Sequence, residues 1–276
     1  MKQSLNLPEP FDGFIWRYAD RVNHPFEHRH DELESNLVLQ GTAVYLLKDR
    51  RYELGRGSLV WFFPDQEHVL LEHTPDFAMW IVVFRRSLLE RVCTSGETGT
   101  LLRTNPEGHF CRRIAEGQLR RLHRLHAEMR SAERDPARYN AGLGYLLLSA
   151  WEIHLAASEE PLATEIHPSV EKAVRLMRDE TGGGRLAGLA RRAGLSPSHL
   201  SRAFKKQTGL PLSEFRNRCR LDRFLTLFGE GRDKQVMRAA LEAGFGSYPQ
   251  FHRVFTRLMG CSPADYRRQV RGGEGE

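Results

Sequence analysis

The sequence has no run of 18 apolar residues, and its first residues lack the apolar core of a signal peptide. We therefore expect a cytoplasmic protein without a membrane span. Cysteine is scarce, and Cys93, Cys111, Cys219 and Cys261 are far apart and form no Cys-x-x-Cys pair. This spacing argues against a disulfide framework and against a cysteine-based zinc site.

Acidic residues are scarce in the C-terminal part of the chain. Residues 168–272 contain 21 Lys and Arg against 9 Asp and Glu, a net charge of +12, although the whole chain of 276 residues carries only +6. The remaining residues are therefore mildly acidic. This asymmetry indicates a polyanionic partner for the C-terminal part alone, although a basic surface that contacts only solvent has the same composition.

Three zones of the chain differ in their hydrophobic pattern. Residues 11–85 consist of short β-rich runs separated by turn residues, which predicts an antiparallel sandwich or barrel. Residues 107–157 carry two apolar stripes at helical spacing and predict a helical hairpin. This hairpin either packs on the neighbouring domain or forms a homodimer contact. From Pro168 the pattern is helical to about Val270.

Residues 186–206 predict two helices joined by a tight turn. Gly194 is placed to end the first helix, because glycine tolerates positive φ. Ser196 can accept hydrogen bonds at the start of the next helix, and Pro197 suits its first position. Polar and basic residues then face outward, which is typical of a helix-turn-helix unit.

A second unit repeats this pattern fifty residues later. Gly244 is the predicted stop, Phe245 fills the corner, and Ser247 is the cap, with Pro249 in the first turn. Two such units in one basic region indicate DNA binding more strongly than either unit alone.

These stretches resemble the AraC-type transcription regulators. The matching segments are residues 195–205 (LSPSHLSRAFK), 243–245 (AGF) and 260–268 (GCSPADYRR). The resemblance covers about residues 168–271 and implies seven helices, with a central helix near residues 211–228 that holds the two units. It also implies that two recognition helices enter successive major grooves of double-stranded DNA, about 34 Å apart.

The second unit departs from the family pattern at three positions. Ala239 stands where the family usually has a larger aliphatic residue, so this unit is expected to pack less tightly. Tyr248 and Pro249 differ from the usual Gln/Ser pair. We therefore expect the first unit to determine most of the sequence reading and the second to adjust affinity.

Arginine can bond guanine in two places, and glutamine suits adenine. We therefore expect His199, Arg202, Gln250 and Arg253 to contact base edges, although any of them could be exposed without touching DNA. Phosphate contacts give affinity without sequence information, and the candidates for them are Lys205, Lys206 and Arg257. Ser198 and Tyr248 complete the outward-facing set.

Histidines gather in the N-terminal zone. On an extended chain His28, His30 and Glu34 point to one side, and a later segment brings His68. Three imidazoles and one carboxylate suit a divalent transition metal such as Zn, Fe, Mn or Ni. The spacing from His28 to Gly41 resembles the first motif of the cupin barrels.

The second cupin motif is met only in part. Gly57 and His68 are in place, but Phe63, Asp65 and Glu72 stand where the motif has proline, glycine and asparagine. Three interpretations follow: a metal site, histidines with a purely structural role, or a metal-free pocket for an organic effector. In the last, the cluster would line the pocket beside Trp61 or Trp80.

We therefore expect a multidomain α+β protein: an N-terminal antiparallel cupin-like β-barrel with a helical hairpin, and a C-terminal all-α double helix-turn-helix domain. The predicted parts are the sensor barrel (1–95), the hairpin with a dimerisation role (96–160), a linker (161–167), the DNA-binding domain (168–272) and a disordered tail (273–276). The expected function is a homodimeric, sequence-specific regulator, not an enzyme, controlled by a small molecule or metal in the barrel. The alternatives are a metal-dependent cupin enzyme fused to a DNA-binding domain, and a nonspecific nucleic-acid binder.

Overall fold

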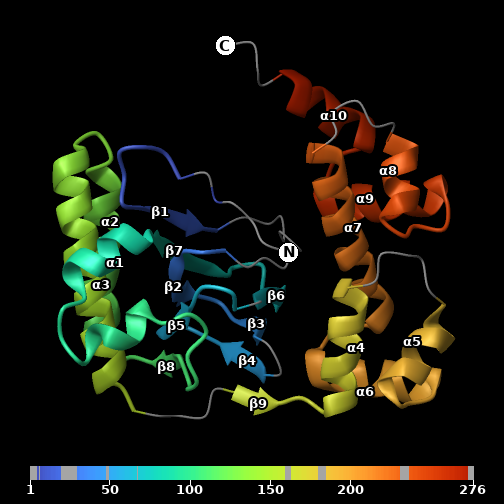
Figure 1. Ribbon diagram of the computed structural model, residues 1–276, viewed down its shortest axis with the longest axis horizontal. Helices are drawn as coiled ribbons and strands as arrows, with labels where there is room; N and C mark the ends of the chain where they lie inside the picture. The colour runs from blue at the N-terminus through green and yellow to red at the C-terminus, as the bar shows by residue number, and fades with distance from the viewer. Residues whose placement is uncertain are drawn as a thin grey trace. The chain divides into compact units, whose positions relative to one another are not determined.

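The computed structural model describes Leu5 and residues 7–19, 30–47, 50–66, 68–158, 163–179, 185–230 and 236–272. These residues group into two compact units. The N-terminal unit holds the described residues up to His68 and from His73 to Thr164, and the C-terminal unit holds Val69–Glu72 and the described residues from Glu165 onward. The N-terminal unit is built on β-sheet and the C-terminal unit on helices (Figure 1). No helix within the described ranges is both long and apolar enough to cross a membrane.

The strands are β1 (Gly13–Tyr18), β2 (Leu33–Gln40), β3 (Ala43–Leu47), β4 (Arg50–Leu54), β5 (Ser58–Phe62), β6 (His68–His73), β7 (Ala78–Phe84), β8 (Cys111–Arg113) and β9 (Ala163–Glu165). The helices of the N-terminal unit are α1 (Arg86–Val92), the 3-10 helix η1 (Thr98–Leu102), α2 (Glu116–Ser131) and α3 (Pro136–Ala156). The later helices are α4 (Pro168–Asp179), α5 (Leu186–Ala193), α6 (Pro197–Thr208), α7 (Leu212–Glu230), α8 (Val236–Glu242), α9 (Tyr248–Met259) and α10 (Pro263–Gly272).

The predicted antiparallel β architecture is confirmed, and its strands form two sheets. One sheet has the order β1-β7-β2-β5-β8, and the other has the order β6-β3-β4-β9. In the first sheet β2 pairs antiparallel with both β5 and β7. Glu34 of β2 therefore lies between Phe62 and Val83, and Ser35 lies beside Trp61.

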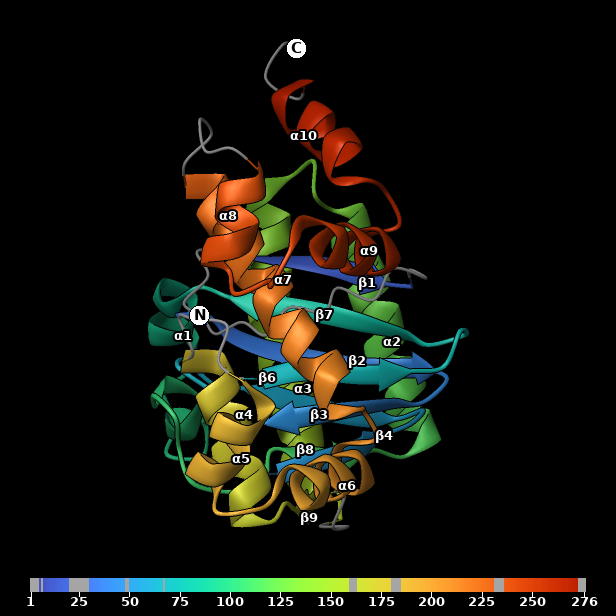
Figure 2. The ribbon, with the colours of Figure 1, turned by 90° about the vertical axis from the view of Figure 1, so that its right-hand side faces the viewer.

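The two faces of the five-stranded sheet meet different surroundings. Leu37, Trp61 and Trp80 belong to one core cluster with apolar residues of α2 and α3, and Figure 2 shows these helices on one side of the strands. Because side chains alternate along a strand, Glu34 points to the opposite face. The hairpin thus shares a core with the sheet, so the boundary predicted at residue 95 does not separate two cores.

The C-terminal unit is organised around its longest helix. Seven helices lie in its described part, and α7 packs against α4 and α6 on one side of the unit and α8 and α9 on the other (Figure 1). Next to α7, Ala239 is completely buried in a cluster that contains Phe224, Phe251 and Phe255. Phenylalanine rings therefore surround the position where the smaller side chain was expected to loosen the packing.

Candidate DNA-binding surface and buried ligand site

Both helix-turn-helix units use the same backbone turn. Gly194 and Gly244 have φ of 79° and 93°, a conformation that glycine adopts without steric cost. In the first turn the Leu195 amide donates to the Ala190 carbonyl at 3.0 Å, and in the second the Phe245 amide donates to the Ala240 carbonyl at 3.1 Å. These bonds satisfy carbonyls at the end of each first helix. The glycine stops predicted from the sequence are confirmed.

Both recognition helices begin with a serine cap. Ser196 accepts from the His199 amide and Ser247 from the Gln250 amide, each at 3.4 Å. Each helix also has proline in its first turn and ends at a left-handed glycine. Local sequence signals therefore set where α6 and α9 start and stop.

Counting from the two caps aligns the outward-facing residues of α6 and α9. His199 and Gln250 both lie three residues after the cap, and Arg202 and Arg253 both lie six residues after it. These four candidates for base contacts thus occupy equivalent positions. Gln250 is half-buried, and the other three are exposed.

The remaining candidates for DNA contact lie at the ends of the same helices. Ser198, Lys205 and Lys206 of α6 are exposed, as are Tyr248 and Arg257 of α9. All are side chains at the surface of a helix, which a polyanion could approach.

Two side chains of the second helix-turn-helix unit have partners inside the protein. The Arg257 guanidinium donates to both carboxylate oxygens of Glu214 in α7, at 2.9 and 2.7 Å. Glu214 raises the pKa of Arg257 through these bonds. The Gln250 carbonyl oxygen accepts from the Gly246 amide at 3.0 Å. The structure thus gives Arg257, expected at a phosphate, a role in joining α9 to α7.

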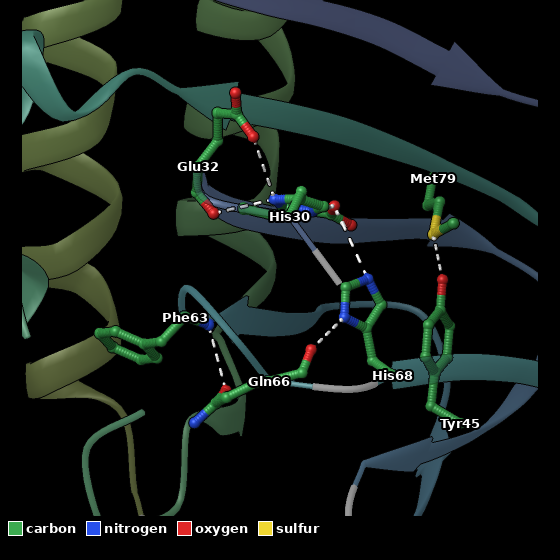
Figure 3. Close-up of polar contacts among 8 residues, drawn as sticks. His30, Glu32, Tyr45, Phe63, Gln66, His68 and Met79 are labelled. Carbon is green, nitrogen blue, oxygen red and sulfur yellow. Dashed lines mark hydrogen bonds and ion pairs between the residues drawn. The ribbon is translucent and has the colours of Figure 1, made fainter. Parts of the chain in front are cut away.

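The N-terminal unit brings together three of the four predicted metal ligands. His30, Glu34 and His68 are 2%, 3% and 2% exposed, and their ligand atoms all lie within 4.8 Å of one another. The His30 Nε2 atom lies 2.8 Å from Glu34 Oε2, and His68 Nε2 lies 3.8 Å from the same oxygen. Figure 3 shows the His30 and His68 rings next to each other. His28, the fourth predicted ligand, lies outside the described residues.

Backbone carbonyls orient both imidazoles. His30 Nδ1 lies 2.9 Å from the Glu32 carbonyl, and His68 Nδ1 lies 3.0 Å from the Gln66 carbonyl. Carbonyls only accept, so each Nδ1 carries the proton and each Nε2 faces Glu34. Burial alone would lower the pKa of His30, but Glu34 and Glu32 outweigh it and hold this pKa above its usual value. The cluster therefore favours a positive centre, either a proton or a metal ion.

Aromatic and polar side chains surround this cluster. The Phe62 ring stacks on His68 with centroids 4.1 Å apart, and Tyr45 stacks on Phe62 at 5.5 Å. The Tyr45 hydroxyl donates to the Met79 sulfur at 3.8 Å. Burial, and then the charge of Glu34, raises the pKa of Tyr45 well above its usual value. The site thus combines a charged centre with an apolar lining, as small-molecule sites do.

Family models match both units. Residues 10–148 match the AraC-like ligand binding domain, and residues 189–269 match a helix-turn-helix domain. The chain belongs to the AraC family of transcription regulators. Its N-terminal unit is the ligand-binding domain, and its C-terminal unit binds DNA.

The chain is similar to several curated relatives and solved structures. The HTH-type transcriptional activator RhaS of Klebsiella pneumoniae is 26% identical over 261 residues, covering 88% of this chain and 87% of its own. The uncharacterized transcriptional regulatory protein YesN of Bacillus subtilis is 32% identical over 114 residues, covering 39% of this chain and 31% of its own. A structure of ToxT from Vibrio cholerae covers 92% of this chain and 97% of its own, with 14% identity and a TM-score of 0.38.

Within the AraC-type ligand-binding domain, the two candidate pocket tryptophans face away from the cluster. Trp61 packs edge-on against Trp151 of α3 at 5.4 Å, and the Trp80 indole donates to His123 of α2 at 2.8 Å. Both lie on the helix-facing side of the sheet, whereas Glu34 lies on the other side. The structure does not bring them together with His30, Glu34 and His68.

Sequence reasoning missed two residues of this site. Asn36 is completely buried two positions after Glu34 on β2, so strand alternation could have placed it on the same face. Tyr45 comes from β3 in the other sheet, and no pattern in the sequence pairs that strand with the cluster.

Proposed function

We propose that this AraC-family regulator reads DNA through α6 and α9, with His199, Arg202, Gln250 and Arg253 at base edges. The observation that carries the proposal is their equivalent position on two capped helices. Because α7 packs against both helix-turn-helix units, the spacing of α6 and α9 is set before DNA binds. Preorganisation of this kind lowers the entropic cost of binding.

The flanking residues supply contacts of other kinds. We assign phosphate contacts to Lys205 and Lys206, since lysine ammonium groups bind phosphate without reading sequence. Ser198 and Tyr248 lie at the start of their helices and complete the surface. The first helix-turn-helix unit then carries most of the sequence reading. In the second, the Arg257 guanidinium and the Gln250 carbonyl oxygen already bind Glu214 and the Gly246 amide.

Selection of bound DNA from a random pool tests this assignment. We expect selected sites to contain two short blocks about 10–10.5 base pairs apart, one for each recognition helix. A pool without enriched sequence, together with a steep salt dependence, would instead support nonspecific binding.

For the ligand-binding domain, we propose that a divalent transition metal or a small molecule binds at His30, Glu34 and His68. Two imidazoles and one carboxylate form a donor set used for such metals. Imidazoles whose Nδ1 proton is held by a carbonyl present Nε2 as a metal ligand. The ligand can control DNA binding only if it has different affinities for two states of the protein.

Metal content tests the metal form of this proposal. Wild-type protein purified under mild conditions should hold about one metal per chain, and Glu34→Gln should weaken metal binding at least tenfold. His109→Gln is the matched control, because His109 is exposed and distant in sequence from the cluster. Sub-stoichiometric metal in the wild type would leave the small-molecule form, in which Glu34 and Tyr45 contact the effector.

We further propose a regulatory rather than catalytic role, in a homodimer formed through the exposed side of α2 and α3. Tyr145 and Leu155 of α3 are large side chains that are 56% and 42% exposed, so a second copy of the chain could cover them. Sedimentation equilibrium of Tyr145→Arg against wild type tests the pairing. Turnover of a candidate compound by the protein would favour the metal-dependent enzyme instead.

A further inference from the structure

The C-terminal unit contains a cleft between the two recognition helices. The cleft has a volume of about 520 Å³. Its walls come from α5, α6, α7 and α9, and its polar lining consists of Ser201, Lys205, Ser213, Arg216, Asn217, Arg220 and Gln250. The site is therefore distinct from the four residues assigned to base edges, apart from Gln250.

The lining of this cleft is positive. Lys205, Arg216 and Arg220 contribute three cations, and no Asp or Glu lines it within the described part of the chain. The first turn of α7 does contain an acid, Glu214. Its carboxylate is bound by Arg257 at 2.7 Å and approached by Arg218 at 3.7 Å. Arg257 and Arg218 thus compensate the charge of this carboxylate, which does not itself line the cleft.

The position of the cleft indicates which anion it meets. Ser201 and Lys205 lie on α6, and Gln250 lies on α9, so the cleft separates the two helices that face DNA bases. Helices that enter successive major grooves leave one stretch of sugar-phosphate backbone between them. That backbone has to cross the face of α7 that lies between α6 and α9.

We propose that this cleft binds one or two DNA phosphates between the two blocks of the site, through Arg216, Asn217 and Arg220 of α7. Guanidinium groups bind phosphate oxygens through paired N–H donors, and an asparagine amide adds a neutral donor. The central helix α7 is then part of the DNA-binding surface, in addition to connecting the two helix-turn-helix units. This inference rests on the proposed reading of DNA by α6 and α9.

Salt dependence of binding measures directly how many phosphates the protein neutralises. The slope of log K against log salt concentration changes by about 0.9 for each phosphate that a variant no longer neutralises. We expect Arg216→Gln/Arg220→Gln to reduce the slope by about 1–2 in magnitude. The affinity for the selected site and for unrelated DNA should fall by the same factor, so the specificity ratio stays unchanged.

The control is Arg175→Gln on α4, which removes one positive charge by the same substitution at an exposed arginine paired with Glu171. It should leave both slope and affinity near wild type. If circular dichroism shows that the double variant is unfolded, the half-buried Arg216→Gln alone provides the comparison, with a slope change of about 1.

Cleft variants with wild-type slope and affinity would overturn the inference, as would an Arg175→Gln control that changes as much as they do. Loss of affinity for the selected site alone would also overturn it, since it would indicate base reading. Wild-type protein without sequence preference would contradict the proposed function instead. In that case the slope on unrelated DNA still decides whether the cleft holds phosphates.

Discussion

His126 and His154 of the N-terminal unit are buried against tryptophan rings. His126 stacks on Trp80 at 5.6 Å, and His154 stacks on Trp151 at 5.2 Å. Burial lowers the pKa of His126 to about 4. Burial, and then the charge of Arg112, lowers the pKa of His154 to about 3. Both side chains are therefore neutral in the folded protein at neutral pH.

These two histidines make the N-terminal unit sensitive to acid. Above pH 6.5 they are neutral in both folded and unfolded chains and add no pH dependence. As the pH falls below 6.5 the unfolded chain takes up protons and the folded one does not. The free energy of unfolding should then fall by about 1.4 kcal/mol per pH unit for each histidine. Urea unfolding between pH 7.5 and 5.5 measures this, and tryptophan fluorescence reports it selectively because all four tryptophans precede residue 152.

His154→Phe isolates one of these contributions, because phenylalanine keeps the ring stack but does not titrate. Its unfolding free energy should depend less steeply on pH than that of the wild type. His109→Gln, an exposed histidine of the same unit, should keep the wild-type dependence. Identical pH dependence in wild type and His154→Phe would show that this pKa is not depressed.

At the residue scale, only some roles could be predicted from the sequence. Gly194 and Ser196 act on neighbouring residues, so local rules sufficed for them. Alternation along a strand groups the residues of one face but does not say whether that face meets a helix or a second sheet. Trp61 and Trp80 were therefore expected near the histidines, although they pack against α2 and α3.

At the element scale, α9 is joined to α7 by an ion pair that connects distant parts of the sequence. Arg257 is 54% and Glu214 17% exposed, so water screens the pair in part. The bidentate geometry is nevertheless favourable. Sequence alone could identify Arg257 as a basic residue on an outward face, but the partner depends on how α7 crosses α9.

A double-mutant cycle on Arg257→Gln and Glu214→Gln measures this connection. We expect each single variant to lower the free energy of unfolding and the two to couple by about 0.5–1 kcal/mol. The control is the more exposed pair of Arg238 and Glu242 on α8, with a 2.9 Å contact, for which we expect coupling near zero. Strictly additive effects for Arg257 and Glu214 would exclude a stabilising link.

At the scale of the whole molecule, the organisation into a β-rich part and a basic helical part follows from composition and hydrophobic pattern. A basic, helical C-terminal part and a β-rich N-terminal part were both predictable, because charge and periodicity are properties of whole segments. The apolar stripes of the hairpin predicted either packing on the neighbouring domain or a homodimer contact, and the structure confirms the packing. The stripes alone could not decide, because an apolar helix face has the same spacing whichever surface covers it. A family with a ligand-binding and a DNA-binding domain accounts for both parts.

The most direct test of two-helix reading is the affinity of Arg202→Ala and Arg253→Ala for the selected site and for each of its single-base variants. Each substitution should weaken binding by about 1–3 kcal/mol and abolish preference at one position. The position should lie in one block for Arg202→Ala and in the other block for Arg253→Ala. Arg175→Ala should change neither affinity nor preference. If both recognition-helix variants keep every preference of the wild type, or lose it at the same position, α6 and α9 do not each read a block of DNA.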